Sequence, residues 1–351
     1  MEENSMRITG YCGVRHAIQR MPKPWFITVL LLAVLLASAG LLAACRGQTE
    51  PQPIRITYAM PVTVAAIPAY VALDRGFWAD EGLEVDAKMF SAGRLALDAL
   101  LGKNAQVMSV SETPLVHAIL QGNKIFIVAT VTAHKEVKLI VRTDHGIRAP
   151  ADLRGKKIAT LPGTNSDFFM HRFLEANGIS PRDVKITNMA PPEMVTALVG
   201  GDIDAYFAWE PHIYYAREHL PGSTAVYPPG DLYAGRHCVA MNQDFVAQHP
   251  EVVPKLIRGF IQAERYVAKH PAEARAIVAK RTGMDDAALR ELWPEYHVAV
   301  QFDRELAEIL DSEARWARGV QGSADPIPRM LDFVYTKALR DVRPASVSIG
   351  Q

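Results

Sequence analysis

The chain has 351 residues, which is enough for two domains that each bury a core. Its 38 basic and 38 acidic residues balance, so the composition does not indicate a nucleic-acid-binding protein, and no block of like charge indicates a disordered tail. The three cysteines, Cys12, Cys45 and Cys238, have the spacing of neither a disulfide framework nor a zinc site.

Residues 1–44 have the composition of a signal peptide. Four basic residues precede an apolar run from Trp25 to Cys45, which is the order of a positive n-region and an h-region. The run ends in LAAC at 42–45 and resembles a bacterial lipobox, which implies that Cys45 is the lipidated first residue of the mature protein. The alternative is an uncleaved transmembrane anchor, because the run is about long enough to span a bilayer. Both interpretations put the rest of the chain outside the cytoplasmic membrane, after a polar, proline-bearing tether at 45–53.

From residue 54 onward, strand-like and helix-like segments alternate, which predicts parallel sheets with helices on their faces. A further strand at 136–142 lies near the point where we expect the chain to leave the first domain. The strands expected before it are 54–60, 83–90, 105–110 and 124–132, and the helices are 65–78, 93–103 and 113–122.

A second alternating block follows. A short apolar run ends at Thr160, and the loop after it leads into a helix with Thr164, Asn165 or Ser166 as N-cap and Gly178 just past its end. Residues 237–242 have the pattern of a strand that returns to the first domain. Strands are also expected at 184–190 and 203–209, and helices at 191–201, 211–220, 244–270, 271–281 and 285–296.

The two blocks resemble each other. Residues 97–114 align with 195–212 at a constant offset, so that Glu112 matches Glu210, and each segment reads as helix, glycine turn, strand and acidic residue. Ligands of open α/β sheets bind beyond the carboxyl ends of the strands. Two such lobes that face each other across hinge strands would form a cleft lined by strand ends and helix N-termini.

Three segments, 68–85, 152–186 and 201–213, resemble the substrate-binding proteins of ABC importers in the nitrate/sulfonate/taurine and thiamine-precursor group (SsuA/THI5-like, NMT1). The resemblance covers residues 54 to 335. It implies an α/β, two-lobed periplasmic-binding-protein fold (type II), with a mainly parallel sheet in each lobe and two hinge strands. It also implies a monomer without catalysis or cofactor that delivers a small organic solute, sulfonate-like, taurine-like or pyrimidine-like, to a permease with a cytoplasmic ATPase. A lipid anchor on the periplasmic or outer-surface side agrees with this function.

The expected domain limits follow from the same alternation. Lobe 1 comprises 54–142 and 238–335, lobe 2 comprises 143–237, and 336–351 are a C-terminal tail. The hinges are expected near 141–144 and 236–239.

The candidate ligand-binding residues lie where strands end and helices begin. Gly163, Thr164, Asn165 and Ser166 offer backbone N–H groups and a positive helix end to an anionic group. The alternative is a plain N-cap loop that faces water. In the first lobe, Ser91 and Gly93 form the matching loop of small residues, which lets a ligand approach the backbone.

Glu112 and Glu210 follow the repeated strands, and their carboxylates suit an amine or a ring N–H. The alternative is that each glutamate caps its own following helix. Trp209 offers a flat surface for a ring or a cation, or else belongs to the core. Strand alternation places Trp209 and Phe207 on one face, opposite Tyr206.

Other chemistries find no support in the sequence. No metalloprotease, serine-hydrolase, P-loop or dinucleotide motif occurs, the histidines are scattered, and Cys238 in an apolar strand reads as a buried thiol. Pyrimidine synthases share the expected fold, but their cysteine-rich motif is missing here. A sensing or partner-docking lipoprotein without a permease remains the other alternative.

Overall fold

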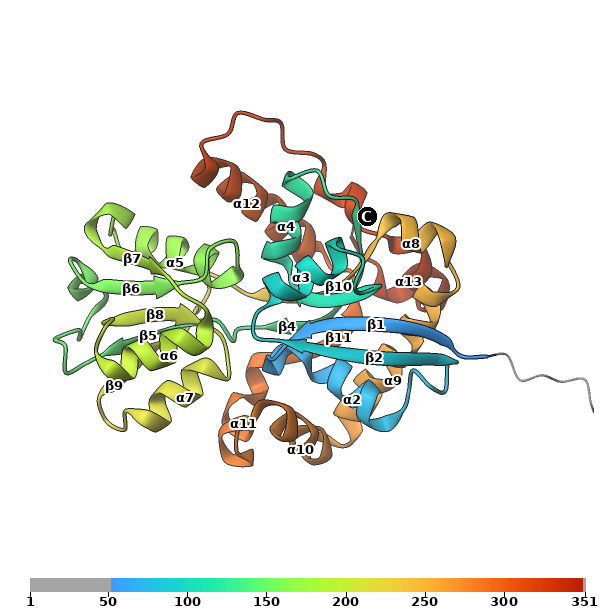
Figure 1. The fold of residues 1–351 in the computed structure, drawn as a ribbon, viewed down its shortest axis with the longest axis horizontal. Helices are drawn as coiled ribbons and strands as arrows, with labels where there is room; N and C mark the ends of the chain where they lie inside the picture. The colour runs from blue at the N-terminus through green and yellow to red at the C-terminus, as the bar shows by residue number, and fades with distance from the viewer. Residues whose placement is uncertain (1–51, 350–351) are drawn as a thin grey trace, which may run out of the picture. The chain divides into compact units, whose positions relative to one another are not determined.

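The computed structural model describes residues 52–349 and contains two β-sheets flanked by helices (Figure 1). We call each sheet with its helices a lobe. The first sheet has the strand order β11-β4-β10-β3-β1-β2, and the second has the order β7-β6-β8-β5-β9. The strands are β1 (Ile54–Pro61), β2 (Leu83–Phe90), β3 (Val107–Ser111), β4 (Ile125–His134), β5 (Lys138–Arg142), β6 (Lys157–Thr160), β7 (Lys185–Asn188), β8 (Ala205–Ala208), β9 (Thr224–Tyr227), β10 (Gly235–Asn242) and β11 (Tyr296–Gln301).

The expected two-lobed α/β fold is confirmed, but both sheets are mixed and not mainly parallel. β1 pairs in parallel with β2 and β3, and β6 with β7 and β8. β10 is antiparallel to β3 and β4, β11 to β4, and β5 to β8 and β9. Two of these antiparallel pairs, β4 with β10 and β5 with β9, follow from the route of the chain, because β4 and β9 carry it out of a lobe while β10 and β5 carry it in.

The chain crosses between the sheets at residues 135–137 and 228–234. The sequence-based limits placed Lys138–Arg142 in the first lobe, whereas this strand, β5, pairs with β8 and β9 of the second sheet. The second hinge was expected near 236–239, which lies inside β10 and pairs with β3 and β4. The run 139–141 is buried throughout, and a buried apolar strand has the same sequence pattern in either sheet. The sequence therefore did not indicate which sheet this strand joins.

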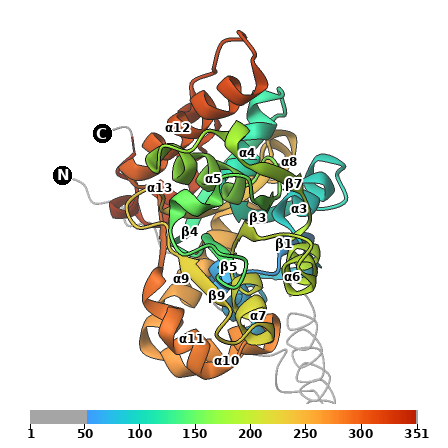
Figure 2. The ribbon, with the colours of Figure 1, turned by 90° about the vertical axis from the view of Figure 1, so that its left-hand side faces the viewer.

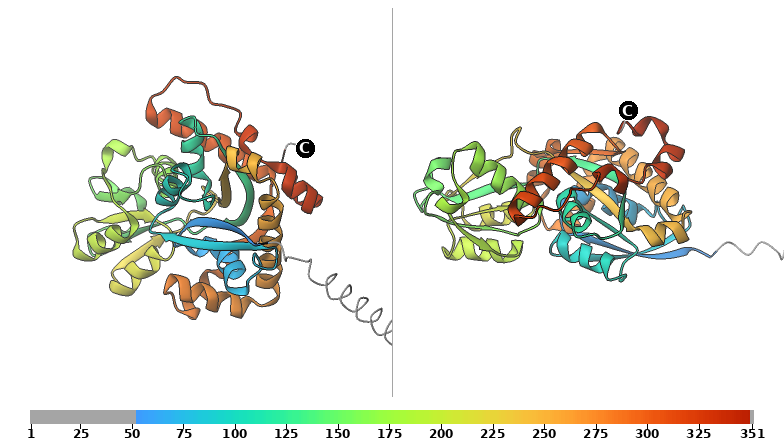
Figure 3. Two further views of the ribbon diagram at one scale, coloured as in Figure 1. Left: turned by 45° about the vertical axis from the view of Figure 1, so that its right-hand side comes forward. Right: turned by 90° about the horizontal axis from the view of Figure 1, so that it is seen from above.

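Residues 336–349 are not a tail. Helix α13 (Thr336–Val342) packs against α9 (Val252–Lys269), and Ala338 and Leu339 belong to the core of the first lobe. Figure 3 shows the red C-terminal segment against this lobe. The segment is short, so its helical periodicity was too weak to be recognised in the sequence.

The remaining helices cover the faces of the two sheets. Thr164 is the N-cap of α5, as one of the sequence alternatives had it. The α-helices are α2 (Ile67–Arg75), α3 (Gly93–Leu101), α4 (Glu112–Leu120), α5 (Asn165–Ala176), α6 (Pro191–Gly200), α7 (His212–His219), α8 (Gln243–Gln248), α10 (Pro271–Thr282), α11 (Asp286–Leu292) and α12 (Arg304–Gln321). Short 3-10 helices are η2 (Val64–Ala66), η3 (Pro150–Leu153), η4 (Pro181–Asp183), η5 (Trp293–Glu295), η6 (Met330–Phe333) and η7 (Pro344–Ser346).

The second sheet separates two small cores. Figure 2 shows α5, α6 and α7 beside the strands of this lobe. Phe207 and Trp209 face α5, while Tyr206 packs with residues of α6 and α7 on the other side. The expected alternation along β8 is therefore confirmed, and it brings Trp209 to the end of the strand on the α5 side. Among the helices within residues 52–349, none has both the length and the apolar character that a membrane span requires.

Close packing of α9 on Trp78 gives a test of the first lobe. A Cβ on Gly259 would lie 2.2 Å from Cδ1 of Trp78, whose ring is buried and donates to the Leu256 carbonyl over 3.1 Å. We expect Gly259→Ala to lower the free energy of unfolding by about 1–3 kcal/mol, because overpacking outweighs helix propensity. Urea denaturation measures the change.

Gly319→Ala is the matched control, because no atom lies within 4 Å of a Cβ at this helical position. It should raise the free energy of unfolding by about 0.5–1 kcal/mol. A stabilising Gly259→Ala would contradict the packing.

Candidate functional site

A cavity lies where strand ends and helix N-termini of the two lobes meet, and the space between its lining atoms, open solvent included, is about 300 Å³. Thr164, Asn165 and Trp209 line it from the second lobe, and Glu136 lines it from the first crossing. The other lining residues, all from the first lobe, are Pro61, Thr63, Gly93, Val110, Ser111, Pro114 and His237.

The loop before α5 turns its own side chains inward. Gly163 has a φ of 74°, and its N–H donates to Oδ2 of Asp167 over 3.0 Å. The Thr164 hydroxyl donates to the Leu161 carbonyl over 2.7 Å and does not cap the helix. As a result, the N–H groups of Asn165 and Ser166 have no hydrogen-bond partner within the described part of the chain. Free amides at the start of a helix are a binding site for an anion.

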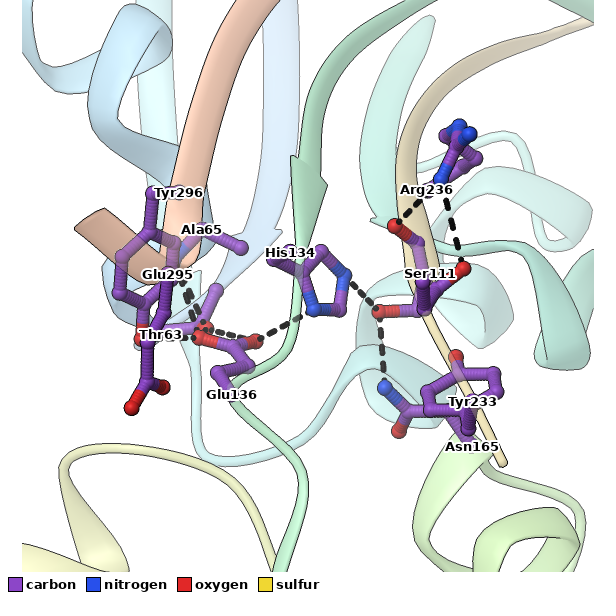
Figure 4. Close-up of polar contacts among 12 residues, drawn as sticks. Thr63, Ala65, Ser111, His134, Glu136, Asn165, Tyr233, Arg236, Glu295 and Tyr296 are labelled. Atoms are coloured by element: carbon purple, nitrogen blue, oxygen red, sulfur yellow. Dashed lines mark hydrogen bonds and ion pairs between the residues drawn. The ribbon is translucent and has the colours of Figure 1, made fainter. Parts of the chain in front are cut away.

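Asn165 also links the two lobes. Its Nδ2 donates to the Ser111 hydroxyl over 3.0 Å, and Nε2 of His134 lies 3.3 Å from the same oxygen (Figure 4). Burial holds the pKa of His134 well below its ordinary value, so this ring is neutral. The contact between Asn165 and Ser111 therefore joins α5 to the end of β3 through neutral groups.

Two buried nitrogen atoms beside the cavity lack a partner among residues 52–349. They are Nε1 of Trp209, in a residue that is 5% exposed, and Nδ1 of His237, in a residue that is 1% exposed. The other ring nitrogen of His237 lies 3.1 Å from the Ser109 hydroxyl, and burial lowers the pKa of His237 to about 3. An unsatisfied buried polar atom costs about 1–3 kcal/mol, so these atoms point to a bound molecule that pairs with them.

Glu136 is a lining residue that the sequence analysis missed. Its carboxyl group accepts hydrogen bonds from the Thr63 hydroxyl over 2.7 and 2.9 Å, the Ala65 N–H over 3.2 Å and the Tyr296 hydroxyl over 3.1 Å. Burial raises the pKa of Glu136 from 4.5 to about 8, although these donors act in the opposite direction. The signal in the sequence was an acidic residue at the edge of a buried apolar strand, between two alternating blocks.

The two glutamates expected in the cleft have protein partners instead, and neither lines the cavity. Glu112 accepts hydrogen bonds from the Tyr233 hydroxyl over 2.6 Å and the Arg236 N–H over 2.8 Å. Burial raises the pKa of Glu112. Glu210 accepts from the Tyr214 N–H over 3.0 Å, which is the helix-capping alternative, and its Oε1 lies 3.3 Å from Nζ of Lys138.

Of four other expected residues, one lines the cavity and three do not. Gly93 lines the cavity, and a Cβ there would lie 2.1 Å from Cγ2 of Val110, so only glycine fits. Ser91 is exposed and does not line it. Ser166 is buried behind the loop beside Thr160 and Thr164, and Gly163 lines a neighbouring groove. Cys45 lies outside the described residues. Within residues 52–349, no group of three or more acidic, histidine or cysteine side chains could hold a metal ion.

Comparisons with known proteins found chains that are similar in sequence and in fold. The family model described as NMT1/THI5 like matches residues 64–274, which is more than half of the chain. A binding protein of Brucella abortus is 26% identical over 272 residues, covering 77% of this chain and 82% of that protein. The taurine-binding periplasmic protein of Escherichia coli is 29% identical over 224 residues, covering 62% and 68%.

Solved structures show the same fold. The alkanesulfonate-binding protein SsuA from Xanthomonas axonopodis, bound to MOPS, has a TM-score of 0.71 at 19% identity, covering 82% of this chain and 99% of that one. The desulfurization enzyme DSZB has a TM-score of 0.63 at 15% identity, covering 83% and 99%. Both of the relatives described above have names that refer to binding proteins, which supports the expectation that the chain is not an enzyme.

The raised pKa of Glu136 predicts how stability depends on pH. The folded protein keeps a proton on this group up to about pH 8, whereas the unfolded chain loses it near pH 4.5. The stability that this proton contributes is present below the unfolded pKa and is lost as the pH rises through about 8. We therefore expect the free energy of unfolding of Glu136→Gln to fall less between pH 5 and pH 8 than that of the wild type. Urea denaturation at several pH values measures both slopes.

Glu175→Gln is the control, because the side chain of Glu175 is 78% exposed. Its slope should follow that of the wild type. If the slope of Glu136→Gln also followed that of the wild type, the conclusion that Glu136 keeps its proton in the folded protein would be wrong.

Proposed function

Because the chain belongs to the NMT1/THI5-like family, we propose that it is an extracytoplasmic receptor that captures a small organic anion of the sulfonate class for an ABC importer. One observation carries this proposal. Asn165, whose backbone amide at the start of α5 is free, lines the same cavity as Trp209 and His237, whose buried atoms Nε1 and Nδ1 have no partner in the described chain.

These groups suit an oxyanion. The amides and the indole N–H are donors, and the positive end of the α5 dipole favours negative charge. A sulfonate offers three acceptor oxygens to such donors. The names of the relatives support the same class, since one binds taurine and a structural neighbour binds alkanesulfonates.

Capture would use both lobes. Trp209 and Asn165 belong to the second lobe, and Ser111 and His237 belong to the first. A solute that contacts both sides favours the arrangement in which the lobes are closed. The crossings at 135–137 and 228–234 are the segments about which such a closure would turn.

Binding of a simple sulfonate tests the proposal. We expect propane-1-sulfonate to bind the purified protein, and Asn165→Ala to weaken binding at least tenfold, because the lobes lose the hydrogen bond from the Asn165 side chain to Ser111 that holds them together around the solute. Isothermal titration calorimetry measures both affinities.

Asn177→Ala is the matched control at the other end of α5, where the amide donates to the Phe173 carbonyl over 2.8 Å. It should keep the wild-type affinity. No binding of any sulfonate by the folded wild type would refute the assigned class.

Lipid anchoring at Cys45 and delivery to a permease complete the proposed function. The supporting feature is the LAAC motif at 42–45 after the apolar run. We expect Cys45→Ser to abolish incorporation of labelled palmitate and to leave the chain unprocessed, with the apolar run at 25–44 still attached. Cys238→Ser is the control, because this thiol is buried, and it should keep the label. A Cys45→Ser variant that is still labelled would exclude lipidation at this residue.

A further inference from the structure

Glu136 is the one acidic residue among the eleven that line the cavity, and no lysine or arginine is among them. The neutral donors described above are suited to an anion. A carboxyl group is suited to the opposite kind of ligand atom, a donor or a cation. The cavity therefore offers one solute both donors for an anionic group and a carboxyl group for a cation or another donor.

The donors and the carboxyl group lie on different sides of the site. Glu136 and Asn165 stand at opposite ends of a row of contacts that runs through His134 and Ser111 (Figure 4). Nδ1 of His134 lies 3.9 Å from Oε1 of Glu136, which is too long for a hydrogen bond. This nitrogen has no partner in the described chain, so the row is interrupted beside Glu136.

The carboxyl group of Glu136 has capacity left on one oxygen. Oε2 accepts from the Thr63 hydroxyl, the Ala65 N–H and the Tyr296 hydroxyl, whereas Oε1 accepts only from Thr63. Because a carboxylate oxygen accepts at two positions, Oε1 has room for another donor.

The neighbouring cation, Lys138, already pairs with other carboxyl groups. Nζ of Lys138 lies 2.9 Å from Oε2 of Glu295 and 3.3 Å from Oε1 of Glu210, and Lys138 is 4% exposed. Lys138 therefore balances the charge of Glu210, and it does not pair with Glu136.

We propose that Glu136 is the residue that determines specificity in this receptor, because Oε1 accepts a hydrogen bond from an ammonium group at the far end of the captured sulfonate. This inference rests on the proposed function. It makes the preferred solute a zwitterion, an aminoalkanesulfonate, and not an alkanesulfonate of the same size. It also links capture to the release of a proton.

The proton balance follows from the groups around Glu136. Tyr70 and Tyr296 stay neutral because burial raises the pKa of each, and burial lowers the pKa of His134. The carboxyl group of Glu210 raises the pKa of Glu136 further. Without ligand, Glu136 is therefore mainly protonated at pH 7. An ammonium group favours the carboxylate, so the Glu136 proton leaves to the buffer when the zwitterion binds.

Calorimetry with two ligands of equal size tests this inference. We would titrate the purified full chain with 2-aminoethanesulfonate and with propane-1-sulfonate, in which a methyl group replaces the ammonium, at pH 6, 7 and 8. Two buffers of different ionisation enthalpy report the number of protons released. We expect about one proton at pH 7 for the amine ligand and none for the other. The affinity for the amine ligand should rise by up to about tenfold per pH unit, levelling off near pH 8.

Variants separate a direct contact from a structural role. Glu136→Gln, which resembles the protonated side chain, should weaken the amine ligand at least tenfold and leave propane-1-sulfonate within about threefold. Glu136→Asp should restore part of the preference. Glu313→Gln is the control for a second buried carboxyl group with a raised pKa, which accepts from Thr113 and does not line the cavity. It should retain both the preference and the proton release.

Each other outcome has a definite meaning. Equal affinity of the wild type for both ligands would overturn the role of Glu136 and leave the proposed function standing. Equal losses for both ligands in Glu136→Gln, or loss of proton release in Glu313→Gln alone, would overturn it too. If neither sulfonate bound, the proposed function would fail together with this inference.

Discussion

Polar groups that are buried between the two lobes need hydrogen-bond partners, and this requirement shapes both crossings of the chain. Glu136 lies in the first crossing and takes donors from η2 and β11. Glu112 holds the second crossing through the Tyr233 hydroxyl and the Arg236 N–H. Two buried carboxyl groups thus tie both crossings to the first lobe. Some of the polar atoms that lack a partner in the described chain belong to residues that line the cavity, namely Asn165 at the start of α5, Trp209 and His237.

Much of this architecture could be predicted from local patterns. The alternation of strands and helices predicted the two lobes, and the order of strand, loop and helix N-terminus predicted that Gly93, Thr164 and Asn165 would lie at a common edge. Strand alternation placed Trp209 and Phe207 on one face of β8, and the structure identifies it as the α5 face. These features depend on residues that are close together in the sequence, which is why they could be predicted from it.

The remaining part depends on partners that are distant in the sequence. The Tyr233 donor to Glu112 lies 121 residues away, and Glu136 meets Thr63 across 73 residues and Tyr296 across 160. Motif spacing therefore favoured Glu112 and Glu210, whose carboxylates form hydrogen bonds or ion pairs with other residues of the protein. It did not single out Glu136 or His237. The same fold also occurs in DSZB, which is named an enzyme, so the chemistry must be argued from the side chains at the cavity and not from the backbone.

The lack of lysine and arginine among the cavity-lining residues has a kinetic consequence. Dipoles act over short distances, whereas fixed charges attract a solute from afar and are screened by salt. With 38 basic and 38 acidic residues in the chain, overall charge adds little attraction either. Encounter with an anion would then proceed by unguided diffusion, at a rate that hardly responds to ionic strength. Discrimination between solutes would reside in how long each one stays.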